Sequence, residues 1–293
     1  MSRHPKPPSR TSSSERSSTE AVQTPAALIA RALAKDYGDG PALHPLTLRI
    51  EEHERVALIG HNGSGKTTFL RMATGLLEPA SGSVTVFGKA PGSMDARRRL
   101  SYLADTPTFY EDLSVWEHLE YTARLHGATD WEQRAADLLG QLGIYERADD
   151  LPTRFSRGLK QKAAIAIAFI RPFDLMLVDE PFVGLDAEGK EALIDLFDEA
   201  STAGAALVVA THELGFVSKT KRTIALRDGQ LILSRHPSRH HADRARRLVQ
   251  RSGRALRVPL LGRQQVDRAR IARRCALHRS PHAVTIVPTF VPA

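Results

Sequence analysis

The chain of 293 residues is 42% hydrophobic and 25% charged, which is typical of a soluble globular protein with room for one large domain or two ordinary ones. No apolar run approaches the roughly 18 residues of a membrane-spanning helix, and residues 1–25 lack the hydrophobic stretch of a signal peptide. The single cysteine, Cys275, excludes an internal disulfide framework and belongs to no metal-ligand pattern. We therefore expect a cytosolic protein.

The net charge of +8 is unevenly distributed along the chain. Residues 236–293 contain 13 arginines and 2 aspartates and carry +11, whereas residues 26–235 contain 24 basic and 29 acidic side chains and carry −5. Residues 1–25, rich in Ser, Pro and Arg, are predicted to be disordered, and so is the basic tail at 236–293. The tail could bind nucleic acid or anionic lipid headgroups, or have no partner, and the sequence leaves these alternatives open.

Between residues 26 and 235 the hydrophobic pattern alternates between strands and helices, which is typical of an α/β domain. Strands are predicted at 46–50, 55–60, 82–88, 175–181 and 206–212. Helices are predicted at 67–77, 114–127, 131–143 and 189–204, with an apolar helix that contains 163–170. Residues 222–233 place an Asp-Gly pair between two apolar runs and predict a β-hairpin with a two-residue turn.

The segment GHNGSGKTT, residues 60–68, follows a predicted strand and precedes a predicted helix. This setting matches the phosphate-binding pattern G-x-x-x-x-G-K-[ST], in which glycines let the backbone wrap around a phosphate and the helix N-terminus faces the anion. Lys66 is expected to reach the β and γ phosphates, and the Thr67 hydroxyl to coordinate Mg²⁺. The residues predicted to bind the nucleotide here are Gly60, His61, Asn62, Gly63, Ser64, Gly65, Lys66, Thr67 and Thr68.

Two acidic residues end the segment LMLVDE, residues 175–180. Its apolar residues predict a strand buried on both faces, which delivers Asp179 to the edge of the sheet beside the phosphate loop, where a carboxylate can hold Mg²⁺ through water. Glu180 is then placed to polarise a water for attack on the γ-phosphate. His212 ends the next strand and is expected at the same edge. The alternative is that the two acids only end a strand at a solvated turn.

The segment FSRGL, residues 155–159, opens a predicted helix and raises a question about its glycine. A serine directly before a helix, here Ser156, is usually an N-cap. Gly158 weakens the helix that follows, so the segment is either only a cap or a place where a backbone N–H binds a ligand, and these residues alone leave both open.

Taken together, the phosphate loop, FSRGL, LMLVDE, GLD (184–186) and TH (211–212) resemble the ATP-binding subunit of an ABC transporter, in that family's order and at its usual separations. The resemblance covers about residues 26–235. It implies an α/β fold, a P-loop NTPase core with an antiparallel β subdomain and an inserted α-helical subdomain at about 105–170, which binds and hydrolyses ATP with Mg²⁺. In this family the signature segment, here FSRGL, binds the γ-phosphate of ATP held by the other subunit of a head-to-tail dimer.

Further residue roles follow from the resemblance alone. It implies that Ser156 donates its hydroxyl and Gly158 its backbone N–H to that γ-phosphate, and that Ser156 also caps the helix. Tyr37 matches the aromatic that stacks on adenine, with an ordinary surface tyrosine as the alternative. Asp186 matches the acid that touches the opposing phosphate loop, and it could also be a helix N-cap. Lys66, Glu180 and His212 are the implied catalytic residues.

The sequence departs from the family pattern in two segments, at three positions. Arg157 and Leu159 replace the second Gly-type and Gln positions of the signature, a form that occurs in export-type members. Asp105 stands where the family usually has a glutamine that contacts Mg²⁺ and the attacking water and relays the ATP state to the membrane partner. A carboxylate can bind Mg²⁺ but cannot donate a hydrogen bond when it is ionised, so we expect the relay at this position to differ.

The resemblance implies a subunit that powers a separate membrane-spanning permease, in an exporter and at the cytoplasmic face of the membrane. The permease is expected to contact the helical insert at 105–155, and a homodimer is the simplest arrangement because one set of motifs is present. A soluble ABC ATPase that acts on nucleic acid or ribosomes is the alternative, with the basic tail as anchor. Asp105 also leaves open a catalytically impaired regulatory subunit.

Overall fold

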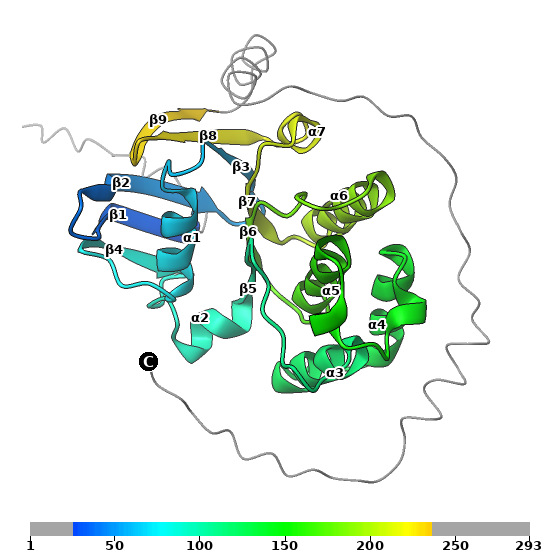
Figure 1. Cartoon of the computed structure of the whole chain (residues 1–293). Helices are drawn as coiled ribbons and strands as arrows, with labels where there is room; N and C mark the ends of the chain where they lie inside the picture. The colour runs from blue at the N-terminus through cyan, green and yellow to red at the C-terminus, as the bar shows by residue number, and fades with distance from the viewer. Residues whose placement is uncertain (1–25, 236–293) are drawn as a thin grey trace, which may run out of the picture.

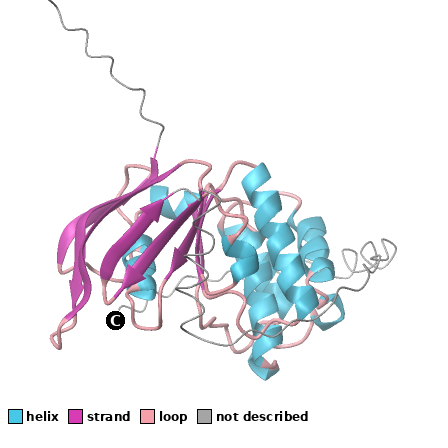
Figure 2. Ribbon diagram, turned by 90° about the horizontal axis from the view of Figure 1, so that it is seen from above, coloured by secondary structure: helices cyan, strands magenta, loops and turns pink. Residues whose placement is uncertain are grey.

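A computed structural model describes residues 26–235, so the predictions for residues 1–25 and 236–293, including the anionic partners of the basic tail, lie outside the described residues. Within the described part of the chain, every helix is too short or too polar to span a bilayer. Two sheets and a group of helices make up the fold, arranged as in Figure 1 and seen from above in Figure 2.

A six-stranded sheet forms the centre of the fold, with strand order β5-β6-β7-β3-β8-β9. The first five of these strands are parallel, and β9 pairs antiparallel with β8. The strands are β3 (Arg55–Ile59), β5 (Leu100–Leu103), β6 (Leu175–Asp179), β7 (Ala206–Ala210), β8 (Arg222–Arg227) and β9 (Gln230–Arg235). Every residue of β3, β6 and β7 is buried, as expected for parallel strands that are covered on both faces.

A smaller antiparallel sheet, with strand order β2-β1-β4, lies on one side of the central sheet (Figure 1). Its strands are β1 (Ala26–Asp36), β2 (Pro41–Glu51) and β4 (Ser81–Val86). The sequence predicted β4 and the end of β2 but not β1, whose pairing with β2 is irregular around Ala32, a residue with a left-handed φ of 46°. Helix α1 (Lys66–Thr74) lies between the two sheets, where Phe69 and Leu70 are fully buried.

The other face of the central sheet is covered by helices (Figure 1). The helices of this face include α3 (Val115–Leu125), α4 (Trp131–Gln141), α5 (Arg157–Phe169) and α6 (Ala187–Thr202). The chain also forms α2 (Met94–Arg99), whose Ala96 packs in the core on the α1 side, α7 (Leu214–Val217) and 3₁₀ turns at Tyr145–Arg147 and Pro152–Arg154. Alternate residues of β3 serve the two cores: Val56 and Leu58 pack with α1 and the antiparallel sheet, and Ala57 and Ile59 pack with the helices of the other face. Helices α3, α4 and α5 make up the expected helical subdomain.

Local sequence explains several helix ends. Helix α3 begins at a capping box formed by Ser114 and Glu117. The helix predicted at 67–77 ends earlier, at Thr74, because Gly75 turns into the left-handed region at φ 79°. Helices α2 and α7 escaped prediction because they are too short to show a helical period in the sequence.

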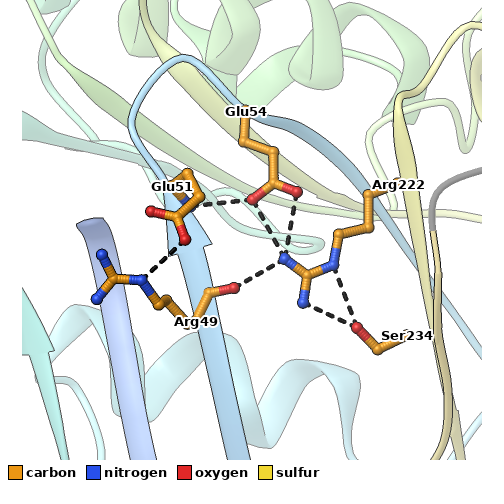
Figure 3. Close-up of polar contacts among 5 residues, drawn as sticks. All are labelled: Arg49, Glu51, Glu54, Arg222 and Ser234. Atoms are coloured by element: carbon orange, nitrogen blue, oxygen red, sulfur yellow. Dashed lines mark hydrogen bonds and ion pairs between the residues drawn. The ribbon is translucent and has the colours of Figure 1, made fainter. Parts of the chain in front are cut away.

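A polar cluster joins the two sheets at the end of β3 that is remote from the phosphate loop (Figure 3). Arg222, the first residue of β8, donates hydrogen bonds to the Arg49 carbonyl oxygen at 2.8 Å and to the Glu54 carboxylate at 3.2 and 3.3 Å. It also donates to Ser234 Oγ at 2.8 and 3.1 Å, while Glu54 accepts from the Glu51 N–H at 2.9 Å. Because Arg49 and Glu51 belong to β2, the cluster holds the antiparallel sheet against the central one.

Candidate functional site

The phosphate loop connects the end of β3 to the start of α1. Gly63 and Gly65 have left-handed φ values of 79° and 96°, and a β-carbon on Gly60 would lie 2.4 Å from the Leu226 carbonyl oxygen. Within the described residues no side chain caps α1, so the backbone N–H groups at its N-terminus remain available to an anion. Asn62 is exposed in the loop, and Thr67 and Thr68 lie half-buried in the first turn of α1. The geometry suits a bound phosphate.

The turn between β8 and β9 braces this loop. Asp228 and Gly229 have positive φ values of 48° and 73°, which confirms the two-residue turn predicted from the Asp-Gly pair. His61 Nε2 lies 3.1 Å from Asp228 Oδ1, and the Gly229 N–H donates to the Ser64 carbonyl oxygen at 3.3 Å. The sequence predicted the turn, whereas its contact with the phosphate loop emerges only from the packing.

Lys66, Glu180 and His212 meet at the carboxyl edge of the central sheet. Lys66 Nζ donates to the Gly60 carbonyl oxygen at 2.7 Å and lies 3.4 Å from Glu180 Oε1. His212 Nε2 lies 3.0 Å from the same carboxylate oxygen. The arrangement follows from strand order, because β7 lies between β6 and β3 and the segments after these strands meet at one edge. Glu180 has a left-handed φ of 45°, and its N–H donates to the Ala210 carbonyl oxygen at 2.8 Å.

Asp179 lies beneath this group, with 1% of its surface exposed. Among residues 26–235 neither of its carboxylate oxygens finds a hydrogen-bond partner. Burial raises the pKa of Asp179, the charges of Glu180 and Asp105 act in the same direction, and the nearby Thr67 hydroxyl and Lys66 ammonium oppose them. A buried carboxylate without a partner, beside a threonine hydroxyl and a phosphate loop, is the donor set expected for Mg²⁺, which binds one or two carboxylates together with substrate phosphates.

Asp105 lies in the irregular segment after β5 and is exposed. Its charge contributes to the raised pKa of Asp179, so the two carboxylates lie in the same neighbourhood.

A second group of predicted residues lies where α5 and α6 begin. Ser156 is the N-cap of α5 and accepts a hydrogen bond from the Leu159 N–H at 3.4 Å, and its side chain is exposed. A β-carbon on Gly158 would lie 2.6 Å from the carbonyl oxygen of Gly184. The glycine therefore has a steric cause, a close backbone contact between the signature segment and the GLD segment, that the sequence does not show.

Asp186 and Tyr37 occupy separate places. Asp186 is the N-cap of α6, accepting from the Gly189 N–H at 2.8 Å, and it also pairs with Lys162 of α5 at 3.0 Å. Tyr37 lies in the turn between β1 and β2 with 59% of its surface exposed, and Lys35 Nζ lies 5.4 Å from its ring centroid. Its ring is accessible to a planar ligand. The contact of Lys162 with Asp186 could not be predicted from the sequence, because no motif includes Lys162.

The fold and the site define a P-loop ATPase whose core carries an antiparallel β subdomain and a helical subdomain. Residues 43–183 match the family model described as ABC transporter. The chain is 36% identical over 203 residues to the SkfA peptide export ATP-binding protein SkfE of Bacillus subtilis strain 168, covering 68% of this chain and 85% of that protein. The chain belongs to the ABC transporter family and is an ATP-binding subunit that hydrolyses ATP to energise transport.

Other relatives agree with this placement. The chain is 37% identical over 191 residues to the ABC-type transporter ATP-binding protein EcsA of the same bacterium, covering 64% of this chain and 77% of EcsA. It is 32% identical over 224 residues to the macrolide export ATP-binding/permease protein MacB of Rhodopseudomonas palustris strain BisB18, covering 72% of this chain and 34% of MacB. Proteins of this family pair with permeases and dimerise.

Solved structures show the same fold. The structure of an ATP-binding subunit of an ABC transporter aligns with a TM-score of 0.69 at 31% identity, covering 75% of this chain and 93% of that one. The ATP-binding cassette MJ0796, in a dimeric post-hydrolysis state bound to ADP and Pi, aligns with a TM-score of 0.66 at 26% identity, covering 71% of this chain and 98% of that one. The match to a cassette bound to ADP and Pi agrees with an ATP-binding chain.

Proposed function

We propose that the chain forms one of two ATP-binding subunits that drive export through a separate membrane-spanning permease, from the cytoplasmic face of the membrane. The observation that carries the proposal is the meeting of Lys66, Glu180 and His212 at one edge of the sheet, with Asp179 buried beside them. The names of two relatives, a peptide export protein and a macrolide export protein, favour outward transport.

The arrangement of charges suggests how the site responds to ATP. In the structure the Lys66 ammonium contacts the Gly60 carbonyl oxygen and the Glu180 carboxylate. Phosphate oxygens at the loop compete for that ammonium, which leaves Glu180 free to accept a proton from the attacking water. His212 then holds the carboxylate from the other side. Asp179 and Thr67 would hold Mg²⁺, which neutralises phosphate charge when it is bound.

The second subunit is proposed because the signature residues face away from their own chain. Ser156 is exposed at the N-terminus of α5, where N–H groups and the helix dipole favour an anion. Asp186 is likewise more than half exposed at the start of α6. In a head-to-tail pair, these residues complete the site around a nucleotide on the opposing phosphate loop.

Contact with the permease is proposed for the helical insert at 105–155. Tyr110 and Tyr121 are exposed aromatic residues whose ring centroids lie 5.6 Å apart, and Leu125 is exposed one turn further along α3. This apolar face follows Asp105 in the chain, so a change at the metal-binding edge has a short path to it. The variant with Tyr110→Ser and Tyr121→Ser should hydrolyse ATP at the basal rate but lose copurification with its permease.

Complementation between two variants tests the composite site. Ser156→Ala damages only the signature, and Lys66→Ala damages only the phosphate loop. In a mixed head-to-tail dimer, the intact loop of one subunit meets the intact signature of the other, so a mixture of two inactive proteins should regain part of the ATPase activity. A mixture that stays inactive, although size-exclusion chromatography shows mixed dimers, would contradict the composite site.

A further inference from the structure

The segment that carries His212 has little regular structure to fix it. Thr211 is buried and its N–H donates to the Leu58 carbonyl oxygen at 3.2 Å, but His212 and Glu213 lie between the end of β7 and the four-residue helix α7. The Glu213 N–H donates to Thr211 Oγ1 at 2.9 Å, which only links the segment to itself. A contact with another element is therefore needed to hold His212 Nε2 at its distance of 3.0 Å from Glu180 Oε1.

Such a tether comes from helix α6. Lys190 Nζ donates a hydrogen bond at 2.8 Å to Oε2 of Glu213, the residue that directly follows His212. Lys190 lies one turn into α6, and its N–H donates to the carbonyl oxygen of Asp186, the N-cap that pairs with Lys162. The first turns of α6 thus carry two ion pairs, one to the signature helix α5 and one to the segment of His212.

Helix α6 is also connected to Glu180 through the chain. The segment between Glu180 and Asp186 is short and leads directly from the end of β6 into α6. An element that holds both ends, Glu180 through this segment and His212 through Glu213, fixes the distance between the imidazole and the carboxylate. A shift of that distance by about 1 Å is enough to change a reaction rate strongly.

We propose that Lys190 and Glu213 are positioning residues that hold His212 against Glu180 for ATP hydrolysis. The inference rests on the proposed role of His212. The pair is partly exposed, with 40% and 32% of the two side chains accessible, and ion pairs of this kind contribute little to stability. Loss of the pair should therefore lower the rate of ATP hydrolysis while leaving the stability of the fold nearly unchanged. A purely structural role would lower both.

The test compares variants of the full chain by ATPase kinetics and thermal unfolding. Lys190→Met and Glu213→Gln should each lower kcat by about 5- to 10-fold, with KM for ATP within about twofold and Tm within about 2 °C of the wild type. The double variant should be no slower than either single variant, because each removes the same pair. Lys190→Arg keeps the cation and should retain the rate within about twofold.

A matched control removes another ion pair of the same helix. Arg134 of α4 lies 3.4 Å from Glu199 of α6, with 39% and 52% of the side chains exposed, far along the helix from its N-terminus. Arg134→Met should leave kcat unchanged. The inference is overturned if Lys190→Met has the wild-type kcat, or if it lowers Tm and kcat together as a misfolded variant does. His212→Ala separates the two hypotheses: a wild-type rate in that variant removes the role of His212 itself, whereas a loss of rate there with no effect at Lys190 removes only the tether.

Discussion

Replacing Gly158 with alanine tests whether a close backbone contact requires this glycine. In a helix alone the change is expected to stabilise by up to about 1 kcal/mol, because alanine has the higher helix propensity. In this chain a β-carbon at residue 158 would lie 2.6 Å from the carbonyl oxygen of Gly184. The two effects have opposite signs, so the measured sign shows which of them dominates.

The distance gives the expected magnitude. Ordinary contacts of a β-carbon begin at 3.4 Å, so the start of α5 or the Gly184 backbone must move by about 0.8 Å to accept the methyl group. Overpacking of this kind typically costs about 1–3 kcal/mol, which exceeds the gain in propensity. We expect a net loss of about 1 kcal/mol, or about 2–4 °C in Tm for a domain of this size. The same shift displaces the segment that leads to Asp186, and hydrolysis should fall about tenfold.

The assay pairs thermal unfolding with steady-state ATPase kinetics. Lys160→Gly, in the same turn of α5, serves as control because it reports what a glycine costs at this end of the helix. The reasoning is refuted if Gly158→Ala raises Tm and hydrolyses ATP at the wild-type rate.

Four further predictions concern the site and the stability of the fold. Glu180→Gln should keep ATP affinity and slow hydrolysis by at least about 10²-fold, and a near-normal turnover would remove Glu180 from the role of base. Asp105→Gln should hold or raise ATPase activity and Asp105→Asn should come close to it, whereas loss of turnover in either variant would make the carboxylate an essential ligand or base. Arg222→Ala removes the cationic partner of the buried Glu54 carboxylate, which keeps only the Glu51 N–H of the contacts described above, and should cost about 2 kcal/mol in denaturant unfolding; an unchanged midpoint would show that the cluster does not hold the two sheets together. Burial lowers the pKa of His118, whose Nδ1 donates to the Ser114 carbonyl oxygen, so the free energy of unfolding should fall as pH drops through about 6.5, and this pH dependence should be weaker in His118→Gln.

Features encoded in short segments could be predicted from the sequence. The phosphate loop, the buried strands β6 and β7 and the Asp-Gly hairpin each depend on a few neighbouring residues, and the structure has them close to the predicted places, although β7 ends at Ala210, before His212. Ser156 also caps the predicted helix, because capping is a contact with the residues that directly follow.

Features that depend on contacts between distant segments could not be predicted. The steric reason for Gly158 lies at Gly184, and the partner of Lys190 is Glu213, so neither local pattern nor spacing reveals them. Strand β1 could not be predicted either, because its hydrophobic pattern is irregular. Its pairing with β2 contains register shifts, and each shift breaks the period of two by which a half-buried strand is read.

The residues at the edge of the sheet carry free-energy costs that the fold alone does not offset. Glu180 holds a left-handed conformation that costs an ordinary residue about 1–2 kcal/mol, and the buried Asp179 carboxylate has no hydrogen-bond partner within residues 26–235. Such costs persist where the surroundings fix the backbone, and here the Glu180 N–H is bonded to the Ala210 carbonyl oxygen of the neighbouring strand. A bound cation would give Asp179 the counter-charge that it lacks, since Lys66 is already shared with Glu180. Nucleotide bound with its metal should therefore offset part of these costs, so we expect ATP with Mg²⁺ to raise the free energy of unfolding.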